Sequence, residues 1–513
     1  MLTNNIRNLD KLLRRFVAIH EGMRQRDKSW YKSMGTTVGG SEVAALLGCN
    51  PYATSHDIVA SKVALLQGKD SWAGGGPACW WGVLFEDIIA MYVEIDLGMP
   101  VRGDEICVQR WPGHRNSPDG YIVARLARRA AVRAHTACAS CAGATGAPSG
   151  AEGATVAHAH EAQEDDLVLW TSDMCESLAE QAQIMLLEFK CPLSRQPTGD
   201  VPPQYRPQLW SGLAVSPVAS AGLFVDAVFR RCALADLGPG PAFDVEYHRR
   251  REPESWPGAV AWGLIGVYAP ALDAPAWVRR GWRGPAWAAG DPDADSKIGD
   301  AAMVAWRLRT DAKAAGLAEL ADSSGLADLS GLSVEADESD ESDLADDADS
   351  PKHVLSRLGI LDLGSCEKPI FDRALDMVNS RRFLSRRLKP CFRAAPLPLR
   401  AAAKELRRGL PLHTPEEVVA AIEGLRSAPR HYELLGVVPW KLFDVAYAPV
   451  ARHRDFRGLT APLIADVHAR VAAALAAPDP DAHLRAARRA AARPRAARDA
   501  ATASELQDLF DNV

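Results

Sequence analysis

The sequence predicts an α/β protein in which helices flank a mixed central sheet. Short apolar runs typical of buried strands occur at 184–187, 223–229 and 262–268. Amphipathic segments with the apolar spacing of helices precede them, over 1–20 and 83–92. Strand-like and helical segments that alternate in this way favour a sheet covered by helices.

The first expected element is a helix that packs on the rest of the protein. Apolar residues recur at helical spacing within its segment, at Ile6, Leu9, Leu13, Phe16 and Val17. No signal-peptide pattern precedes it, and the chain has no run of 18 apolar residues. We therefore expect an intracellular protein that does not enter the membrane.

The composition is that of a soluble globular protein. Apolar residues make up 47% and charged residues 24% of 513 residues, enough for two or three domains or for one large core with insertions. Ten cysteines without a framework of spacings fit reduced thiols rather than disulfides.

The acidity of the chain is local. The net charge is −6, but residues 335–349 hold nine acids and no base, and without them it would be +3. Such a block is typical of a disordered, solvated linker; a partner-binding segment or a DNA mimic is the alternative.

A second low-complexity segment, rich in Ala, Gly, Ser and His, covers about 124–166. Its cysteines and histidines could bind zinc or could be a coincidence of composition; they are His135, Cys138, Cys141, His158 and His160. Because the cost of closing a loop grows only logarithmically with its length, strands on either side could still pair.

An acid before this insertion and a triplet after it form the most informative pattern. Asp119 stands in Ser-Pro-Asp-Gly, and Glu188-Phe189-Lys190 follows the apolar run 184–187. On a strand, Glu188 and Lys190 would share one face while Phe189 turns into the core. Two carboxylates and a backbone carbonyl suit Mg²⁺, and a nearby lysine could orient or deprotonate the attacking water in phosphodiester hydrolysis. The same triplet also occurs as a solvated strand end.

Three further segments contain candidate residues for the same site. Ser41 is expected to cap a short helix that ends at Gly48, where a phosphate could bind; simple capping is the alternative. Glu86 follows Trp-Gly and is a candidate third acid, or an acid of a first helical turn. Gln208 could reach into the same cleft or lie at the surface.

In this order the segments resemble the phage-type exonuclease and viral recombinase branch of the PD-(D/E)xK nucleases. The segments 223–232 and 436–445 are similar to parts of the herpesvirus alkaline nucleases, and the resemblance spans roughly 30–459 outside the two low-complexity segments. It implies a restriction-endonuclease-like core with helical N- and C-terminal parts.

The resemblance also implies a domain division. Residues 1–270 would form the nuclease core with its N-terminal helical part, and 271–350 a connecting region. Residues 351–475 would form the C-terminal part of the nuclease fold, followed by an Ala/Arg-rich tail over 476–513. The tail holds a helix-like stretch with six arginines over 483–498, which could touch phosphates, serve as a nuclear address or be a solvated helix.

Residue roles follow from the resemblance position by position. Asp119 and Glu188 would bind Mg²⁺ with the Phe189 carbonyl, and Mn²⁺ is expected to substitute. Lys190 would be the catalytic lysine, Glu86 a supporting acid, and Gln208 would match the glutamine after the catalytic strand. The 5′-phosphate of a strand end would contact Ser41 and Ser117. The basic residue that these enzymes place before the serine helix has no clear match, and Lys32 is the nearest candidate.

Tracking along DNA requires basic side chains that contact phosphates. The first candidates cluster on one expected helix, Arg381 and Arg382 above all, with Arg386, Arg387, Lys389 and Arg393. A solvated basic face is the alternative.

The expected activity is Mg²⁺-dependent 5′-to-3′ exonuclease cleavage of duplex DNA at alkaline pH by a monomer in the host nucleus, during viral DNA processing and recombination. The expected partner is a viral single-strand DNA-binding protein. One alternative is an RNA endonuclease that degrades host messages, also in the host cytoplasm; another is a scaffold for a recombination complex.

Overall fold

The computed structural model describes the chain in separate stretches. They cover 2–23, 25, 28–69, 77–129, 131–132, 167–171, 174–192, 195, 197–237, 259, 261–270, 351–358, 360–364, 392–396, 415–427 and 432–492. The expected zinc ligands, the acidic block, and Arg381 with Arg382 lie outside these residues.

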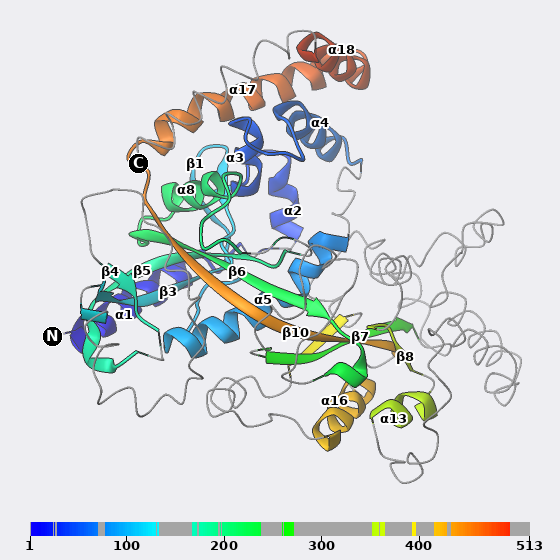
Figure 1. The fold of residues 1–513 in the computed structure, drawn as a ribbon. Coiled ribbons are helices and arrows are strands. Elements are labelled where there is room, and N and C mark those ends of the chain that lie inside the picture. The colour runs from blue at the N-terminus through cyan, green and yellow to red at the C-terminus, as the bar shows by residue number, and fades with distance from the viewer. Residues whose placement is uncertain are drawn as a thin grey trace, which may run out of the picture.

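The core is an eight-stranded sheet. Seven strands lie side by side in the order β4 (Leu167–Leu169), β3 (Gly120–Arg128), β5 (Ala179–Lys190), β6 (Ala221–Arg231), β10 (Tyr432–Ala451), β7 (Ala261–Pro270) and β9 (Phe392–Pro396). β8 (Leu361–Asp362) pairs with β10 in parallel, as β5 does with β6, and the other pairs are antiparallel. The predicted mixed sheet flanked by helices is confirmed (Figure 1).

The long strand β10 joins distant parts of the chain. It pairs along one edge with β6, from Trp440 opposite Arg231 to Ala451 opposite Ala221, and along the other edge with β7. Figure 1 shows it crossing the middle of the molecule. The two segments that carry the herpesvirus resemblance are therefore neighbours in the sheet.

Both faces of the sheet are covered, which explains the continuous apolar run before Glu188. Ile184 and Leu186 pack toward the helices on one face, whereas Met185 and Leu187 pack toward the other, as the alternation of a strand requires. A strand buried on both sides needs apolar residues at every position. The predicted buried strand is confirmed.

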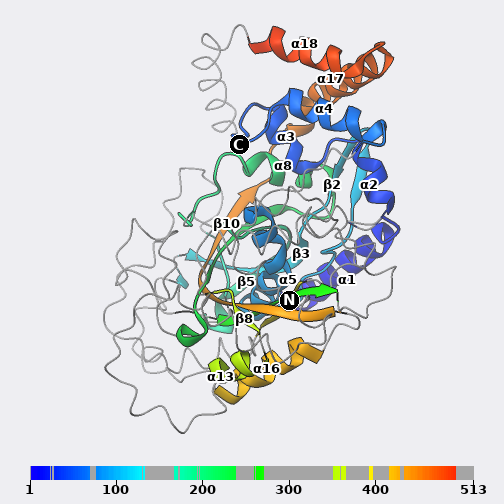
Figure 2. The same ribbon diagram turned by 90° about the vertical axis from the view of Figure 1, so that its right-hand side faces the viewer.

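The helices divide between the two faces and one end of the sheet. One face packs on α1 (Leu2–His20), α3 (Gly40–Leu46), α4 (Ser55–Leu66), α8 (Arg206–Val215) and α17 (Phe456–Ala476). The other face packs on α5 (Pro77–Leu97). The end formed by β7 and β8 packs on α13 (Pro351–Leu358) and α16 (Pro415–Ser427) (Figure 2). The predicted helices over 1–20 and 83–92 are confirmed.

Smaller elements complete the fold. A hairpin of β1 (Val108–Trp111) and β2 (His114–Asn116) forms a separate two-stranded sheet. α2 (Lys28–Met34) precedes α3, α18 (Pro480–Ala492) follows α17, and two 3₁₀ turns are η1 (Glu176–Leu178) and η2 (Leu234–Asp236).

Helix α17 uses one face to pack on the protein. It is long and apolar enough to cross a membrane, and among the described residues it alone meets that criterion. Its buried side chains, such as Phe456, Ile464 and Val471, recur at helical spacing, and they pack in the cluster that also holds α4 and α8. The buried apolar residues of α17 are therefore part of the core.

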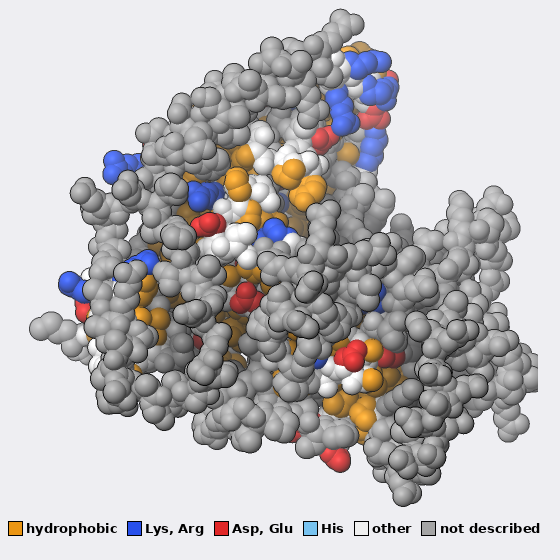
Figure 3. Space-filling view, in the orientation of Figure 1, with side chains coloured by type: hydrophobic (Ala, Val, Ile, Leu, Met, Phe, Trp, Pro, Cys, Tyr) orange, Lys and Arg blue, Asp and Glu red, His pale blue; other side chains and the backbone are white. Residues whose placement is uncertain are grey.

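Helix α18, the last helix among the described residues, is basic on its exposed surface. Arg485, Arg488 and Arg489 are exposed, and Figure 3 shows Lys and Arg side chains gathered over this helix. Arg488 lies 3.4 Å from Asp57 of α4, an ion pair at the surface. The predicted Ala/Arg helix is confirmed for 483–492, and its role in binding phosphates stays a prediction.

Candidate active site

Glu188 and Lys190 lie together at the end of β5. The Lys190 ammonium donates to the Glu188 carboxylate in an ion pair, with Glu188 buried and Lys190 partly exposed. Phe189 between them is buried in the cluster on the α5 face. The prediction that the triplet would divide in this way is confirmed.

Asp119 reaches the same place from the far side of the insertion. Its Oδ2 accepts a 2.6 Å hydrogen bond from the backbone N–H of Phe189. The register of β3 on β5, with Gly120 opposite Leu187, positions Asp119 there. The acid and the triplet, far apart in sequence, therefore form one site.

The charged groups at this site shift one another's pKa values. Burial raises the pKa of Glu188, the Lys190 ammonium opposes that rise, and Glu86 adds to it through its own negative charge; the pKa stays above its ordinary value. Burial lowers the pKa of Lys190, but Glu188 and Asp119 outweigh burial, so this pKa lies above its ordinary value. Lys190 therefore carries its positive charge at alkaline pH. Of the two roles expected for the lysine, these surroundings favour orienting the attacking water over deprotonating it, because deprotonation requires a neutral amine.

Glu86 lies in the middle of a helix. Helix α5 begins at Pro77, so Glu86 is more than two turns inside it, and a role as an acid of the first turn is excluded. The side chain is partly buried, and its charge acts on Glu188. Of the two interpretations of Glu86, the acid near the site fits the structure.

The serine helix begins one residue before the predicted cap. Gly39 is the N-cap of α3, and its N–H donates 2.6 Å to Oε2 of Glu42. The expectation that Ser41 caps this helix is wrong, because Gly39 and Glu42 form the capping pair and Ser41 lies inside the first turn, exposed. The predicted end is confirmed, with Gly48 at φ 76°.

Asn116 fixes how closely α3 approaches the β1–β2 hairpin. A Cβ added to Gly40 would stand 2.0 Å from Asn116 Oδ1, closer than any real contact. Glycine at position 40 therefore permits the approach. It places the start of α3 beside the segment that leads into Ser117 and Asp119.

Ser117 and Gln208 belong to different parts of the fold. Ser117 Oγ accepts a 2.9 Å hydrogen bond from Trp30 Nε1, which holds the hydroxyl two residues before Asp119. Gln208 is partly exposed in the first turn of α8, whose N-cap is Tyr205. Roles for Ser41, Ser117 and Gln208 in binding substrate stay predictions.

Sequence reasoning missed a second charged pair beside Lys190. Asp226 of β6 is the register partner of Lys190, and both of its oxygens accept from the Arg195 guanidinium, one at 2.8 Å. The Lys190 ammonium also lies 5.2 Å from the Tyr205 ring centroid. A signal was present, because Asp226 alone carries charge within the apolar run 221–229.

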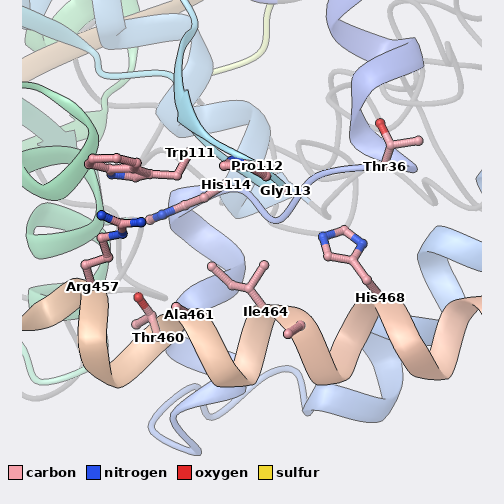
Figure 4. Close-up of a pocket in the computed structure, with 11 residues that line it drawn as sticks. Thr36, Trp111, Pro112, Gly113, His114, Arg457, Thr460, Ala461, Ile464 and His468 are labelled. Atoms are coloured by element: carbon pink, nitrogen blue, oxygen red, sulfur yellow. The ribbon is translucent and has the colours of Figure 1, made fainter.

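A cavity of about 500 Å³ lies elsewhere, between the β1–β2 hairpin and α17 (Figure 4). Its lining includes Trp111, His114, Arg457 and His468, and the Arg457 guanidinium carbon lies 3.7 Å from the Trp111 ring centroid. Asp119, Glu188 and Lys190 do not line it. The cavity is separate from the cluster of charged residues at the end of β5.

The donor set at the end of β5 consists of oxygen atoms. Asp119 and Glu188 offer carboxylates, and Glu86 acts on Glu188 from α5. Among the described residues, no three His, Cys, Asp or Glu side chains are gathered closely enough to hold a metal ion. Two carboxylates as the protein donors fit Mg²⁺, which retains several waters and seldom takes an all-protein cage.

Comparisons with known proteins cover this part of the chain. Residues 24–219 match the YqaJ-like viral recombinase domain family. A protein of African swine fever virus is similar: its version in the Tick/Malawi isolate is 31% identical and that in the Tick/South Africa isolate 30% identical, each over 248 residues. These residues are 48% of this chain and 60% of each relative, so the chain spans less than two thirds of these relatives. The residues that match the family model, 24–219, include Asp119, Glu188 and Lys190.

Proposed function

We propose that this protein is a metal-dependent nuclease that cleaves duplex DNA from a 5′ end during viral DNA processing and recombination. The hydrogen bond between Phe189 and Asp119 carries the proposal, because it unites both carboxylates and the lysine at one strand end. The match to a viral recombinase domain family over 24–219 supports DNA as the substrate.

Asp119 and Glu188 would hold Mg²⁺ together with the Phe189 carbonyl, and Mn²⁺ would substitute. When bound, the ion would lower the pKa of water and stabilise charge on the phosphate. Lys190 neutralises Glu188 in an ion pair, so its ammonium lies beside the residues that would hold the ion. There a positively charged side chain would stabilise the developing charge on the phosphate oxygens.

Two neighbouring strands support a specific relationship of this protein to the herpesvirus alkaline nucleases. The segments similar to those enzymes, 223–232 and 436–445, pair along β6 and β10. Both segments lie outside the residues 24–219 that match the recombinase domain. We infer a nuclease that acts in the host nucleus as a monomer, with a viral single-strand DNA-binding protein as its partner.

The experiment compares end-labelled duplex DNA with a structured RNA as substrates. Wild type, Asp119→Asn and Lys190→Ala are each incubated with Mg²⁺ or with EDTA. The proposal predicts stepwise loss of nucleotides from 5′ ends of DNA, only with metal and only in wild type. Cutting in EDTA, or wild-type rates in both variants, would refute the site. Cleavage of RNA without cleavage of DNA would replace the proposed substrate with RNA.

A further inference from the structure

The cavity between the β1–β2 hairpin and α17 has the size and composition of a site for a small molecule. Its volume is about 500 Å³, within the range of about 300–1,000 Å³ that is usual for ligand pockets. Most of its lining is apolar, with residues such as Pro112, Ile464 and Ala465, and a few polar side chains lie among them. Such a lining is the usual form of a ligand site.

One wall of the cavity is a face of α17. The residues that this helix contributes recur at the spacing of a single helix face and include Arg457, Ala461, Ile464 and His468. Figure 4 shows Arg457 beside Trp111 at one end of the cavity and His468 at the other. Positions 457 and 468 are 11 residues apart, which corresponds to about 16 Å of helix. The cavity is therefore elongated, and its two ends differ in chemistry.

One end of the cavity is positively charged. The guanidinium carbons of Arg457 and Arg110 lie 3.7 and 4.7 Å from the Trp111 ring centroid. The Trp111 indole donates to the Ala214 carbonyl at 3.3 Å, which fixes the ring. Both arginines are exposed, and neither has a carboxylate partner in the part of the chain that the structure describes. Because an arginine stays charged and binds phosphate oxygens in a bidentate way, this end suits a phosphate group.

The other end offers a hydrogen bond in apolar surroundings. The Nε2 atom of His468 is buried and has no hydrogen-bond partner among the described residues. A Cβ added to Gly113 would stand 2.4 Å from this nitrogen, so glycine in the hairpin turn lets the ring approach the turn closely. Between the two ends, the Thr460 hydroxyl donates to the Phe456 carbonyl at 2.8 Å, which leaves its oxygen able to accept. A buried polar atom without a partner favours a ligand that supplies one.

We propose that this cavity is a nucleotide-binding site outside the active site. The phosphate would bind to Arg457 and Arg110, and the base would lie along Ile464 with its polar edge toward His468. A nucleoside monophosphate carries its anion and its base on opposite sides of a sugar. This order matches a cavity that is cationic at one end and apolar, with a hydrogen-bonding atom, at the other. The choice of a nucleotide among anionic aromatic ligands rests on the proposed function.

Helix α8 separates this site from the charged residues at the end of β5. Its N-cap Tyr205 lies beside Lys190, whereas Ala214, near its other end, accepts from Trp111. Positions 205 and 214 are 9 residues apart, which corresponds to about 14 Å of helix. That length equals about four nucleotides of a stacked strand, at about 3.4 Å each. The nucleotide could therefore be free in solution or belong to a strand that extends from the active site.

Isothermal titration calorimetry in EDTA tests the site without cleavage. Deoxyadenosine 5′-monophosphate and deoxyadenosine are titrated into wild type, Arg457→Gln and Ala461→Phe; both positions are exposed on α17, and the phenylalanine would fill the cavity. Arg426→Gln, which removes an exposed charge of α16, is the matched control. Arg457→Gln is expected to weaken binding of the monophosphate about 10- to 100-fold and binding of the nucleoside little. Ala461→Phe is expected to abolish both. Monophosphate binding that stays at the wild-type level in either variant would overturn the site.

Two further titrations locate the ligand and test its base. Asp119→Asn is expected to bind the monophosphate like wild type; binding that falls in Asp119→Asn and not in Arg457→Gln would place the nucleotide in the active site and overturn the inference. Inorganic phosphate that binds as tightly as the monophosphate would also overturn it, because the base would then contribute nothing. A single-stranded pentanucleotide that binds more tightly than the monophosphate, and is weakened by Arg457→Gln, would support a nucleotide within a strand. A pentanucleotide that binds no more tightly would support a free mononucleotide.

The same measurements separate this inference from the proposed function. A chain that binds the monophosphate in this way and never cuts DNA would refute the nuclease and retain the nucleotide site. A chain that cuts DNA with metal but binds no monophosphate in EDTA would refute the nucleotide site alone.

Discussion

The backbone N–H of Phe189 and the carboxylate of Asp119 are joined by a 2.6 Å hydrogen bond. This contact connects two strands that the insertion separates in sequence. The amide N–H comes from the middle of the Glu188-Phe189-Lys190 triplet, so any shift of β3 relative to β5 would move Asp119 away from it. The strand register therefore determines the geometry of the candidate active site.

The insertion between β3 and β4 is expected to be dispensable. Arg128, the last residue of β3, is the register partner of Leu167, the first residue of β4, so a short turn could join them. Replacing 130–165 with about five Gly/Ser residues is expected to leave the melting temperature within a few degrees and DNA cleavage within about threefold of wild type. Thermal unfolding and cleavage assays check this. Loss of cleavage with the fold intact would show that the insertion contributes to function.

Gly40 is expected to tolerate no side chain while Asn116 is present. A Cβ at position 40 would stand 2.0 Å from Asn116 Oδ1, so Gly40→Ala is expected to destabilise the protein by about 1–3 kcal/mol. Chemical denaturation measures the change. Gly40→Ala combined with Asn116→Ala should recover part of the loss, and strictly additive losses would contradict the contact as its cause.

His114 is expected to make stability fall in mild acid. Burial lowers the pKa of this ring to about 4, and its Nε2 lies 2.7 Å from Ser211 Oγ. Between pH 6.5 and 4 the unfolded chain binds a proton there that the folded chain does not, so stability present at neutral pH is lost as the pH falls. From pH 7 to 5, wild type is expected to lose about 2 kcal/mol more than His114→Gln. Equal pH dependence in denaturation curves of the two proteins would exclude His114 as the cause.

Asp226 and Arg195 are expected to stabilise each other beside Lys190. Asp226 is buried, and both of its carboxylate oxygens accept from Arg195. A double-mutant cycle with Asp226→Asn and Arg195→Gln should give a coupling of about 1–3 kcal/mol in the free energy of unfolding. A coupling near zero would show that solvent screening cancels the pair.

The strands near the site were predictable because local pattern determines them. Leu186 and Leu187 face opposite apolar layers, so the run before Glu188 is apolar throughout. The cap of α3 was mispredicted because serine is a common cap residue. In the structure, the hydrogen bond from the Gly39 N–H to the Glu42 carboxylate determines where the helix starts. The ion pair between Glu42 and Lys62 forms only in the tertiary structure, and the spacing of the two residues in the sequence does not reveal it.

Arg115 shows where prediction from sequence ends. An arginine between His114 and Asn116 has no local feature that marks it as buried, because arginine is usually exposed. Its burial depends on Trp30 of α2 and on the approach of α3, contacts between parts of the chain far apart in sequence. A buried arginine of this kind is recognised only from the folded arrangement.

The most direct test measures the single-turnover rate of duplex DNA cleavage in Mg²⁺ for wild type, Asp119→Asn, Glu188→Gln and the double variant. If the two carboxylates act as one centre, each single variant loses about a thousandfold or more. The double variant is then no slower than the worse single one, because residues that act as a unit are not additive. Either single variant cutting at the wild-type rate, or losses that multiply in the double variant, would contradict a shared site.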